Sequence, residues 1–547
     1  MKRNTIFKLI AIAFPFFLIL VVEVILRLVG YGEGYELFHK IISENKTEYY
    51  VMNSGVSQKY FKNTGFHSDN QSDLFLKKKT DSTFRVFVQG ASTVVGFPFY
   101  KNGSFPRLLK HRLSLTFPNR NIEVVNTGIT AVNSYTLWDL SEEIIKQDPD
   151  LVIIYAGHNE YYGALGAGSS VFIGEHPFLV RTYLRLKNLR FFQLLENGYA
   201  KIFRAKKDDG LQVGDSTLME VMAREQQIPY KSEVFEAGIQ QFQSNLEKIL
   251  ANYQSHDIPV ILSTLVSNER DIPPFISEDL DEEQFRKALD SKDENTGKIA
   301  QKNAMAAYLL GQYYLERQPD SAKKYLEIAK ELDLLRFRAP EKINEIIQQL
   351  SEKEDVALVD MKRVFEARSE SGIIGDELLT EHVHPNVEGN FVMADAFYNK
   401  IKELQLLGNW QHFVSYQEAY RDIPISKIDS IRGKMIVQDL KRSWPYVLDM
   451  SGRNPVRQYH FLQNPSFEEQ KAIALYSGKE KWEDVMRLAY HTYLKDGDLE
   501  NALKVAQSLI AEFPEQARVY EMAANICLQM KRPEYAKFYS DKAEKLK

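Results

Sequence analysis

Five short apolar runs constrain the fold of this chain more than any other feature of its sequence. They are Phe84–Gln89, Ile122–Asn126, Leu151–Ala156, Pro259–Thr264 and Val356–Asp360. Their length and composition are typical of buried strands. Helix-like segments separate the first three runs, and this alternation predicts a parallel sheet that is covered on both faces. We therefore expect a three-layer α/β/α domain with a five-stranded parallel sheet.

Polar residues and glycines follow the first three predicted strands, where sites form in such sheets. Ser92 stands between Gly90 and Gly96, so a tight turn can present its hydroxyl, although a serine here can also simply cap a helix. Gly128 follows the second strand, and its N–H can face a ligand or belong to a plain turn. Asn159 follows the third, where its amide can donate to a developing oxyanion or stand in a turn.

The loop after the fifth strand reads Glu381-His382-Val383-His384-Pro385-Asn386. An acid three residues before a histidine lets one loop supply both an imidazole base and the carboxylate that orients it. The alternative is a solvated loop with two histidines. A metal site at His382 and His384 would need more ligands, and the sequence offers no obvious third partner. We therefore expect no metal and no cofactor.

These residues appear in the order Ser, Gly, Asn, His. In this respect the sequence resembles the SGNH (GDSL-like) hydrolase superfamily, which is named for these four residue types. The resemblance covers roughly residues 84–164, 233–268 and 354–401. It implies a flavodoxin-like strand order and catalysis through an acyl-serine intermediate.

The resemblance also implies a role for each residue. Ser92 would be the nucleophile, His384 the general base and Glu381 the carboxylate that orients it. The oxyanion hole would comprise the N–H groups of Ser92 and Gly128 and the side chain of Asn159.

The sequence departs from the family at three positions. Ala91 replaces the usual Asp before the nucleophile, Ala131 replaces a frequent second Gly, and Glu381 replaces the usual Asp. His382 is an alternative base, but the Pro-Asn pair that follows His384 matches the family better. Glu381 is the triad member that these departures put most in question.

The N-terminus carries an apolar run, Leu9–Val29, that would form about 30 Å of helix, enough to cross a bilayer core. Glu23 and Arg27 interrupt it and stand four apart, so they can pair on one helical face. Three basic residues precede it: Lys2, Arg3 and Lys8. Their position favours an N-terminus inside and the bulk of the chain outside the cytoplasm. The alternative is a cleaved signal peptide, but Glu23 to Tyr31 contains no typical small-residue cleavage site.

Two insertions interrupt the predicted hydrolase domain. The first, at about 165–232, carries Arg181, Arg185 and Arg190 and then a polar stretch, Lys206–Ser216. It can cover the mouth of the site or be a helical decoration. The second, at about 270–350, has the spacing of a tetratricopeptide helix pair. We expect further helix at Leu332–Arg338 and Ile343–Leu350.

The C-terminal part has a period of 34 residues and resembles tetratricopeptide repeats. The matched pairs are Ala502 with Ala536, Leu509 with Ala543 and Tyr493 with Cys527. Such helices either only pack or offer a concave surface to a protein partner. The predicted domains are a signal anchor at 1–30, a membrane-proximal segment at 31–81, the hydrolase-like domain at 82–404, a helical connector at 405–478 and repeats at 479–547.

The composition narrows the function. A net charge of -5 without a basic block argues against nucleic acid as a partner, and a single cysteine excludes an internal disulfide framework. The leading hypothesis is a membrane-tethered esterase or deacylase on the extracytoplasmic, periplasmic side that acts on an O-acylated envelope glycan or another ester. The alternatives are an O-acyltransferase that works with a membrane acyl-donor partner, and a non-catalytic scaffold that uses its repeats.

Overall fold

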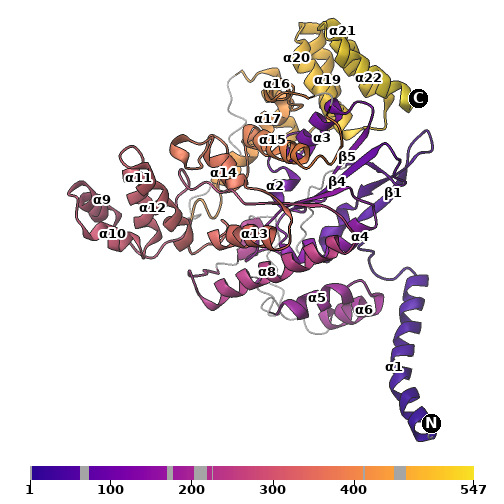
Figure 1. Ribbon diagram of the computed structural model, residues 1–547, viewed down its shortest axis with the longest axis horizontal. Helices are drawn as coiled ribbons and strands as arrows, with labels where there is room; N and C mark the ends of the chain where they lie inside the picture. The colour runs from indigo at the N-terminus through magenta and orange to yellow at the C-terminus, as the bar shows by residue number, and fades with distance from the viewer. Residues whose placement is uncertain are drawn as a thin grey trace.

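The computed structural model describes residues 3–61, 73–168, 176–201, 218–223, 226–410, 413–448 and 464–547 (Figure 1). The predicted polar stretch Lys206–Ser216 lies outside the described residues.

A five-stranded parallel sheet forms the centre of the molecule, with the order β5-β4-β6-β7-β8. The strands are β4 (Thr83–Gly90), β5 (Asn121–Asn126), β6 (Leu151–Tyr155), β7 (Val260–Ser263) and β8 (Ala357–Val359). This is the flavodoxin-like order 2-1-3-4-5. The predicted strands, their parallel direction and their order are confirmed.

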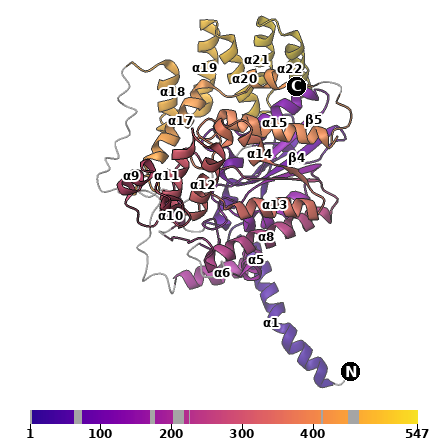
Figure 2. The same ribbon diagram turned by 60° about the vertical axis from the view of Figure 1, so that its left-hand side comes forward.

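Helices cover both faces of the sheet (Figures 1 and 2). One face carries α3 (Phe105–Thr116), α14 (Met361–Glu366) and α15 (Val387–Glu403). The other carries α4 (Ser134–Ile145), α8 (Glu233–Gln254) and α13 (Glu341–Lys353). The expected three-layer α/β/α architecture is therefore confirmed.

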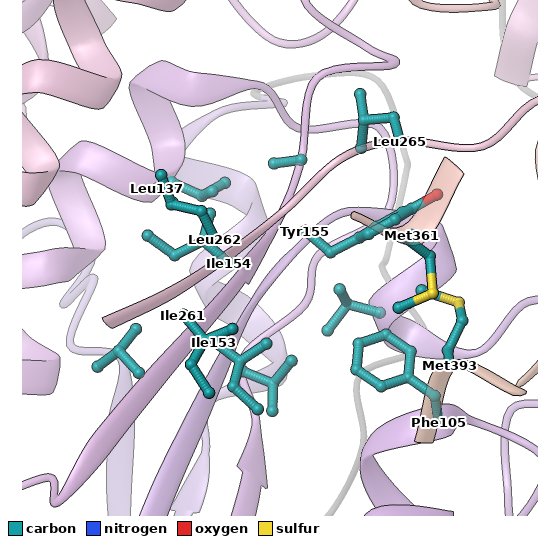
Figure 3. Packing of buried hydrophobic residues seen from close by; sticks show 14 of the residues in the cluster. Phe105, Leu137, Ile153, Ile154, Tyr155, Ile261, Leu262, Leu265, Met361 and Met393 are labelled. Carbon is teal, nitrogen blue, oxygen red and sulfur yellow. The ribbon is translucent and has the colours of Figure 1, made fainter. Parts of the chain in front are cut away.

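The core is built on the central strand β6, all of whose residues are buried. Successive side chains of a strand point to opposite faces, so β6 packs on both helical layers. Figure 3 shows Ile154 beside Leu262 and Leu137 on the α4 side, and Phe105 and Met393 grouped on the other side. A fully buried side chain of this size contributes about 1.5–3 kcal/mol, which explains why both faces of the sheet are apolar.

The N-terminal segment contains a long helix and a small antiparallel sheet. The helix is α1 (Arg3–Leu28), and the strands are β1 (Phe38–Ile42), β2 (Glu48–Met52) and β3 (Phe75–Leu76). No strands are predicted from the sequence in this part of the chain. Phe38 and Phe75 attach it to the main domain, since their ring centroids lie 5.7 and 5.5 Å from that of Phe87 on β4.

Helix α1 is long and apolar enough to span a membrane. Its segment Phe7–Leu28 has a mean hydropathy of 2.9 and is almost entirely exposed, and it is the one such helix among the described residues. The expected pairing of Arg27 with Glu23 is present, at 2.7 Å.

Both insertions contain helices. The first forms α5 (Pro177–Leu186), α6 (Arg190–Tyr199) and α7 (Leu218–Ala223). The second forms α9 (Glu282–Asp290), α10 (Asn295–Ala300), α11 (Ala304–Tyr314) and α12 (Pro319–Leu332), of which the last two pack as a pair.

The expected helix at Leu332–Arg338 is wrong, because α12 ends at Leu332. The buried Arg338 accounts for the loop that follows. Its guanidinium lies 3.0 Å from Asp333 and donates to the carbonyl of Ile272 at 2.9 Å, and these contacts hold the chain in a loop. The helix expected at Ile343–Leu350 is present within α13.

The C-terminal region is helical. It comprises α16 (Tyr416–Arg421), α17 (Lys427–Lys441), α18 (Phe467–Tyr476), α19 (Trp482–Asp496), α20 (Leu499–Glu512), α21 (Ala517–Gln529) and α22 (Pro533–Leu546). The helices α19 to α22 pack in succession, and Cys527 is fully buried between them, where burial raises the pKa of its thiol to about 12. Glu512 of α20 forms ion pairs with Lys101 at 2.7 Å and with Arg107, which fixes these helices on the α/β domain.

Candidate active site

The turn between β4 and α2 (Ser92–Val95) presents Ser92. β4 ends at Gly90, where a side chain would lie 2.3 Å from the carbonyl oxygen of Tyr155 on β6, so only glycine fits this close approach. Ser92 is the first residue of the helix, and its N–H therefore has no acceptor within the helix. Both the hydroxyl and the N–H of Ser92 are thus available at the carboxyl end of the sheet.

His384 lies directly opposite Ser92. Its Nε2 is 2.7 Å from Ser92 Oγ, and its Nδ1 is hydrogen-bonded to Glu381 Oε1. The same carboxylate oxygen accepts the backbone N–H of His384 at 2.9 Å. With Nδ1 protonated toward the carboxylate, Nε2 carries the lone pair that faces the serine hydroxyl. The structure therefore brings the predicted nucleophile, base and acid into one chain of hydrogen bonds.

The loop that carries His384 is folded back on itself. The N–H of Thr380 donates to the carbonyl of His384 at 2.8 Å, and the N–H of Asn386 donates to the carbonyl of Leu378 at 2.9 Å. The side chain of Asn386 then caps α15 by accepting the N–H of Gly389. The Pro-Asn pair after His384 therefore ends the loop and begins the helix, which holds the imidazole in place.

His382, the alternative base, takes a different place. Its Nδ1 is 2.7 Å from the hydroxyl of Tyr446, and its backbone N–H donates to Glu381 Oε2 at 2.8 Å. Among the described residues, the imidazole hydrogen-bonded to Ser92 is that of His384. The geometry favours His384 as the base.

Tyr446 is a residue of the site that sequence reasoning missed. Its hydroxyl donates to Glu381 Oε2 at 2.7 Å, which is the carboxylate oxygen that does not face His384 Nδ1. Its ring packs edge-on against Phe275 at 5.1 Å. Tyr446 follows α17, in the predicted connector and far from the histidine loop in sequence, so no local motif could have indicated it. We regard it as a positioning residue for Glu381.

A Tyr446→Phe variant is expected to lower kcat by about tenfold. The variant removes a hydrogen bond to a charged carboxylate, and such a bond is worth about 1.5–3 kcal/mol. This is enough for a tenfold loss of rate, which corresponds to about 1.4 kcal/mol. The charge on Glu381 would then act more strongly on the His384 imidazolium, so the acid limb of kcat/KM should move to higher pH. A pH–rate profile measures both effects. An unchanged limb would show that Tyr446 only packs.

Burial changes the pKa of His384, the predicted general base. It lowers the pKa of His384 to about 3, below its ordinary value of 6.5. A general base acts only when it is neutral, so activity is lost as the pH falls through this pKa. We expect the acid limb of kcat/KM to lie well below pH 6.5, which a profile from pH 3 to 8 would show. A limb at or above pH 6.5 would contradict the effect of burial.

The loop after β5 contains Gly128, whose N–H is a predicted oxyanion donor. The N–H of Gly128 donates to the side chain of Asn126 at 2.9 Å. A side chain at Gly128 would meet the backbone of α2 at 2.9 Å, so this glycine allows the Ser92 helix to pack closely. Thr130 and Ala131 of this loop border the cavity beside Ser92, and Ala131 has a positive φ of 64°.

Asn159 lines the same cavity. Its neighbour Glu160 is fully buried, and the Glu160 carboxylate accepts hydrogen bonds from the N–H of Ser134 at 3.1 Å and from the Gln241 amide. Burial raises the pKa of Glu160 to about 7. These bonds tie the loop that carries Asn159 to α4 and α8, so Glu160 holds the predicted oxyanion donor in place.

A cavity of about 140 Å³ opens beside Ser92. Its lining is largely apolar and includes Phe97, Tyr155, Met219, Met222 and Phe337. The two methionines belong to α7, so the first insertion does contribute to the wall of the site. Arg181, Arg185 and Arg190 of the same insertion are not part of the lining. A larger cavity, of about 380 Å³, lies between α3 and the C-terminal helices, away from Ser92.

Glu381, His382 and His384 lie close enough together to offer ligand atoms to one metal ion. The hydrogen bonds already engage these atoms, since His384 contacts Glu381 and Ser92, and His382 contacts Tyr446. The hydrogen bonds place an imidazole between a serine hydroxyl and a carboxylate, an arrangement that suits a general base better than a metal ligand set.

No protein-family model and no curated protein matches the sequence. An acetylxylan esterase from Geobacillus stearothermophilus is a similar solved structure, with 13% identity over 61% of this chain and 98% of that chain and a TM-score of 0.30. A lipase/acylhydrolase from Enterococcus faecalis is 13% identical over 59% of this chain and 97% of that chain, with a TM-score of 0.29.

The fold has the arrangement that the resemblance to SGNH hydrolases implied. The parallel sheet has the expected order, and a serine, an asparagine and a histidine stand at the expected strand ends and loop. The hydrogen bonds among Ser92, His384 and Glu381 are those of a serine hydrolase.

Proposed function

We propose that this protein is a membrane-tethered serine esterase that removes a short acyl group from an O-acylated envelope glycan or another ester outside the cytoplasm. The observation that carries the proposal is the 2.7 Å contact between Ser92 Oγ and His384 Nε2, completed by Glu381. A serine hydroxyl needs such a base because it is a weak nucleophile on its own. Helix α1 supports the tether, and its basic N-terminal flank supports an extracytoplasmic site.

The reaction follows from the geometry. His384 Nε2 takes the proton of Ser92 Oγ while Oγ forms a bond to the ester carbonyl carbon. The tetrahedral intermediate collapses, the C–O bond to the alcohol breaks, and His384 returns the proton to the departing alcohol oxygen. A water molecule then attacks the carbonyl carbon of the acyl-serine and loses a proton to His384. The bond between this carbon and Ser92 Oγ breaks, His384 returns the proton to Oγ, and the acid leaves. Glu381 stabilises the imidazolium in both halves of the cycle.

Three donors are proposed for the oxyanion. They are the N–H of Ser92, the side-chain amide of Asn159 and, in place of Gly128, the N–H of Ala131. Removing one such donor costs about 3–4 kcal/mol in other hydrolases. The positive φ of Ala131 supports its role, because it gives this alanine the backbone conformation that a glycine adopts readily.

The size of the cavity supports a short acyl group. A volume of about 140 Å³ is close to the ~150 Å³ that accommodates benzene in an engineered cavity, so an acetyl or butyryl group fits and a long chain does not. Met222 and Met219 form part of this wall.

Hydrolysis of p-nitrophenyl esters by the full-length protein in nanodiscs tests the proposal. We expect kcat/KM for acetate to exceed that for octanoate by at least about tenfold, which is the effect of about 1.4 kcal/mol. Met222→Ala should narrow this ratio by enlarging the cavity, and the exposed substitution Lys298→Ala serves as the control. Octanoate hydrolysed as fast as acetate would contradict a short acyl pocket. Hydrolysis of none of the esters would contradict the esterase proposal.

The C-terminal helices have a separate proposed role. We propose that α19 to α22 form tetratricopeptide-like pairs that receive a protein partner on their concave surface. The succession of packed helices and the small buried residues Ala502, Ala536 and Ala543 support this proposal.

A further inference from the structure

The first insertion lies against the C-terminal end of α1. Figures 1 and 2 both show α6 beside this end of the helix, with α5 next to α6. Glu23 Oε2 accepts the N–H of Phe191 in the first turn of α6, at 2.8 Å. Arg27 donates to the carbonyl of Asn188 at 3.1 Å. These bonds fix the hairpin formed by α5 and α6 to the apolar helix.

The position of Glu23 fixes the depth of this contact. The apolar segment ends at Leu28, five residues later, so Glu23 lies about 8 Å inside that end at 1.5 Å per residue. Helices that lie in a membrane interface bury their apolar faces by about 5–10 Å. The start of α6 therefore lies at the depth that an interfacial helix occupies, if α1 spans the bilayer.

The inner face of the hairpin is packed on the α/β domain. Val180 and Leu184 of α5 are fully buried, and α5 contacts both α4 and α8. Arg181 donates to the Asn245 side chain at 2.7 Å. The hairpin is thus attached to the catalytic domain as well as to α1.

The outer side of the hairpin exposes large apolar side chains. Phe178 is 73% exposed, Leu195 54% and Tyr199 62%. Further exposed leucines lie on the same two helices and their link: Leu179, Leu186, Leu189 and Leu194. A concentration of large exposed apolar side chains on two short helices is typical of an interaction site. Because α6 contacts α1, whose apolar side chains are also exposed, the occupant that fits these side chains is a lipid bilayer.

We propose that the hairpin of α5 and α6 lies in the membrane interface, as a second contact with the bilayer beside α1. This inference rests on the proposed role of α1 as a membrane anchor. Two contacts fix the orientation of the catalytic domain, whereas a single helix would let it rotate. The same insertion continues into α7, whose Met219 and Met222 line the cavity, so the insertion links the membrane surface to the wall of the active site.

Spin labels on the full-length protein in nanodiscs of phosphatidylcholine and phosphatidylglycerol test this proposal. The background is Cys527→Ala, and single cysteines replace Leu195 in the hairpin, Leu18 in α1 and Lys537 on α22, an exposed site at the opposite end of the molecule. The measured quantity is the collision rate of each label with oxygen, which enters the bilayer, relative to a water-soluble nickel chelate.

We expect the label at position 18 to report a deep position, the label at 195 a depth of about 5–10 Å, and the label at 537 full exposure to water. A label at 195 that matches 537, with 18 deep, would overturn the interfacial hairpin and leave the anchor intact. A label at 195 shielded from both reagents would show that protein covers the hairpin, which also overturns the proposal. A label at 18 exposed to water would contradict the anchor itself.

Discussion

Ser92→Ala is expected to lower kcat for short acyl esters by about 10⁶-fold, the loss that follows removal of the nucleophile in other serine hydrolases. The reason is that, among the described residues, the hydroxyl hydrogen-bonded to His384 Nε2 is that of Ser92, which places it to form the acyl-enzyme. Stopped-flow and steady-state hydrolysis of p-nitrophenyl acetate would measure the loss. Because Ser92 is partly exposed at the cavity, the substitution should leave the fold intact.

Two further variants make this result specific. Ser291→Ala, at an exposed position on the second insertion, should retain the parent rate. The double variant Ser92→Ala/His384→Ala should lose no more than Ser92→Ala alone, because residues that act as a unit are not additive. A Ser92→Ala variant that retains more than about a tenth of the parent kcat would show that another group performs the reaction.

Glu381→Gln is expected to lower kcat by about 10⁴-fold, as the corresponding acid-to-amide change does in other triads. Glu381 is fully buried, and its two oxygens accept from His384 and from Tyr446. An amide of the same size offers one acceptor and one donor, so it favours the tautomer of His384 that cannot accept the serine proton. Steady-state kinetics would measure the loss, and circular dichroism would show whether the fold persists.

Glu381→Asp is the matched control for this change. This substitution keeps the negative charge but shortens the side chain by one methylene group. We expect it to retain most of the activity that Glu381→Gln loses, because aspartate is the usual acid of the family that the sequence resembles. Equal rates for Glu381→Gln and the parent enzyme would show that Glu381 does not orient the base.

Much of the site could be predicted because parallel strands end at the same edge of a sheet. Ser92 and Asn159 each follow a buried strand directly, so recognising the strands was enough to place both side chains together. Glu381 and His384 share one short loop, and their spacing of three residues fixes their contact locally. These inferences needed no knowledge of distant packing.

The features that the sequence did not reveal depend on long-range contacts or on backbone direction. Tyr446 reaches Glu381 from a separate helical region, and its position depends on how that region packs. The proposal of Ala131 in place of Gly128 as an oxyanion donor rests on the hydrogen bond of the Gly128 N–H and on the backbone conformation of Ala131, which a residue type does not specify. The loop at Arg338 replaced a predicted helix because its buried guanidinium binds backbone carbonyls.

Labelling of the full-length protein with a fluorophosphonate tests the central claim most directly, because this reagent reacts only with a serine that a neighbouring base activates. Mass spectrometry would locate the modified residue, with Ser92→Ala and His384→Ala as comparisons. We predict labelling of the parent protein at Ser92, none of Ser92→Ala and little of His384→Ala. Equal labelling of all three, or labelling of none together with no ester hydrolysis, would contradict the assignment of this chain as a serine hydrolase.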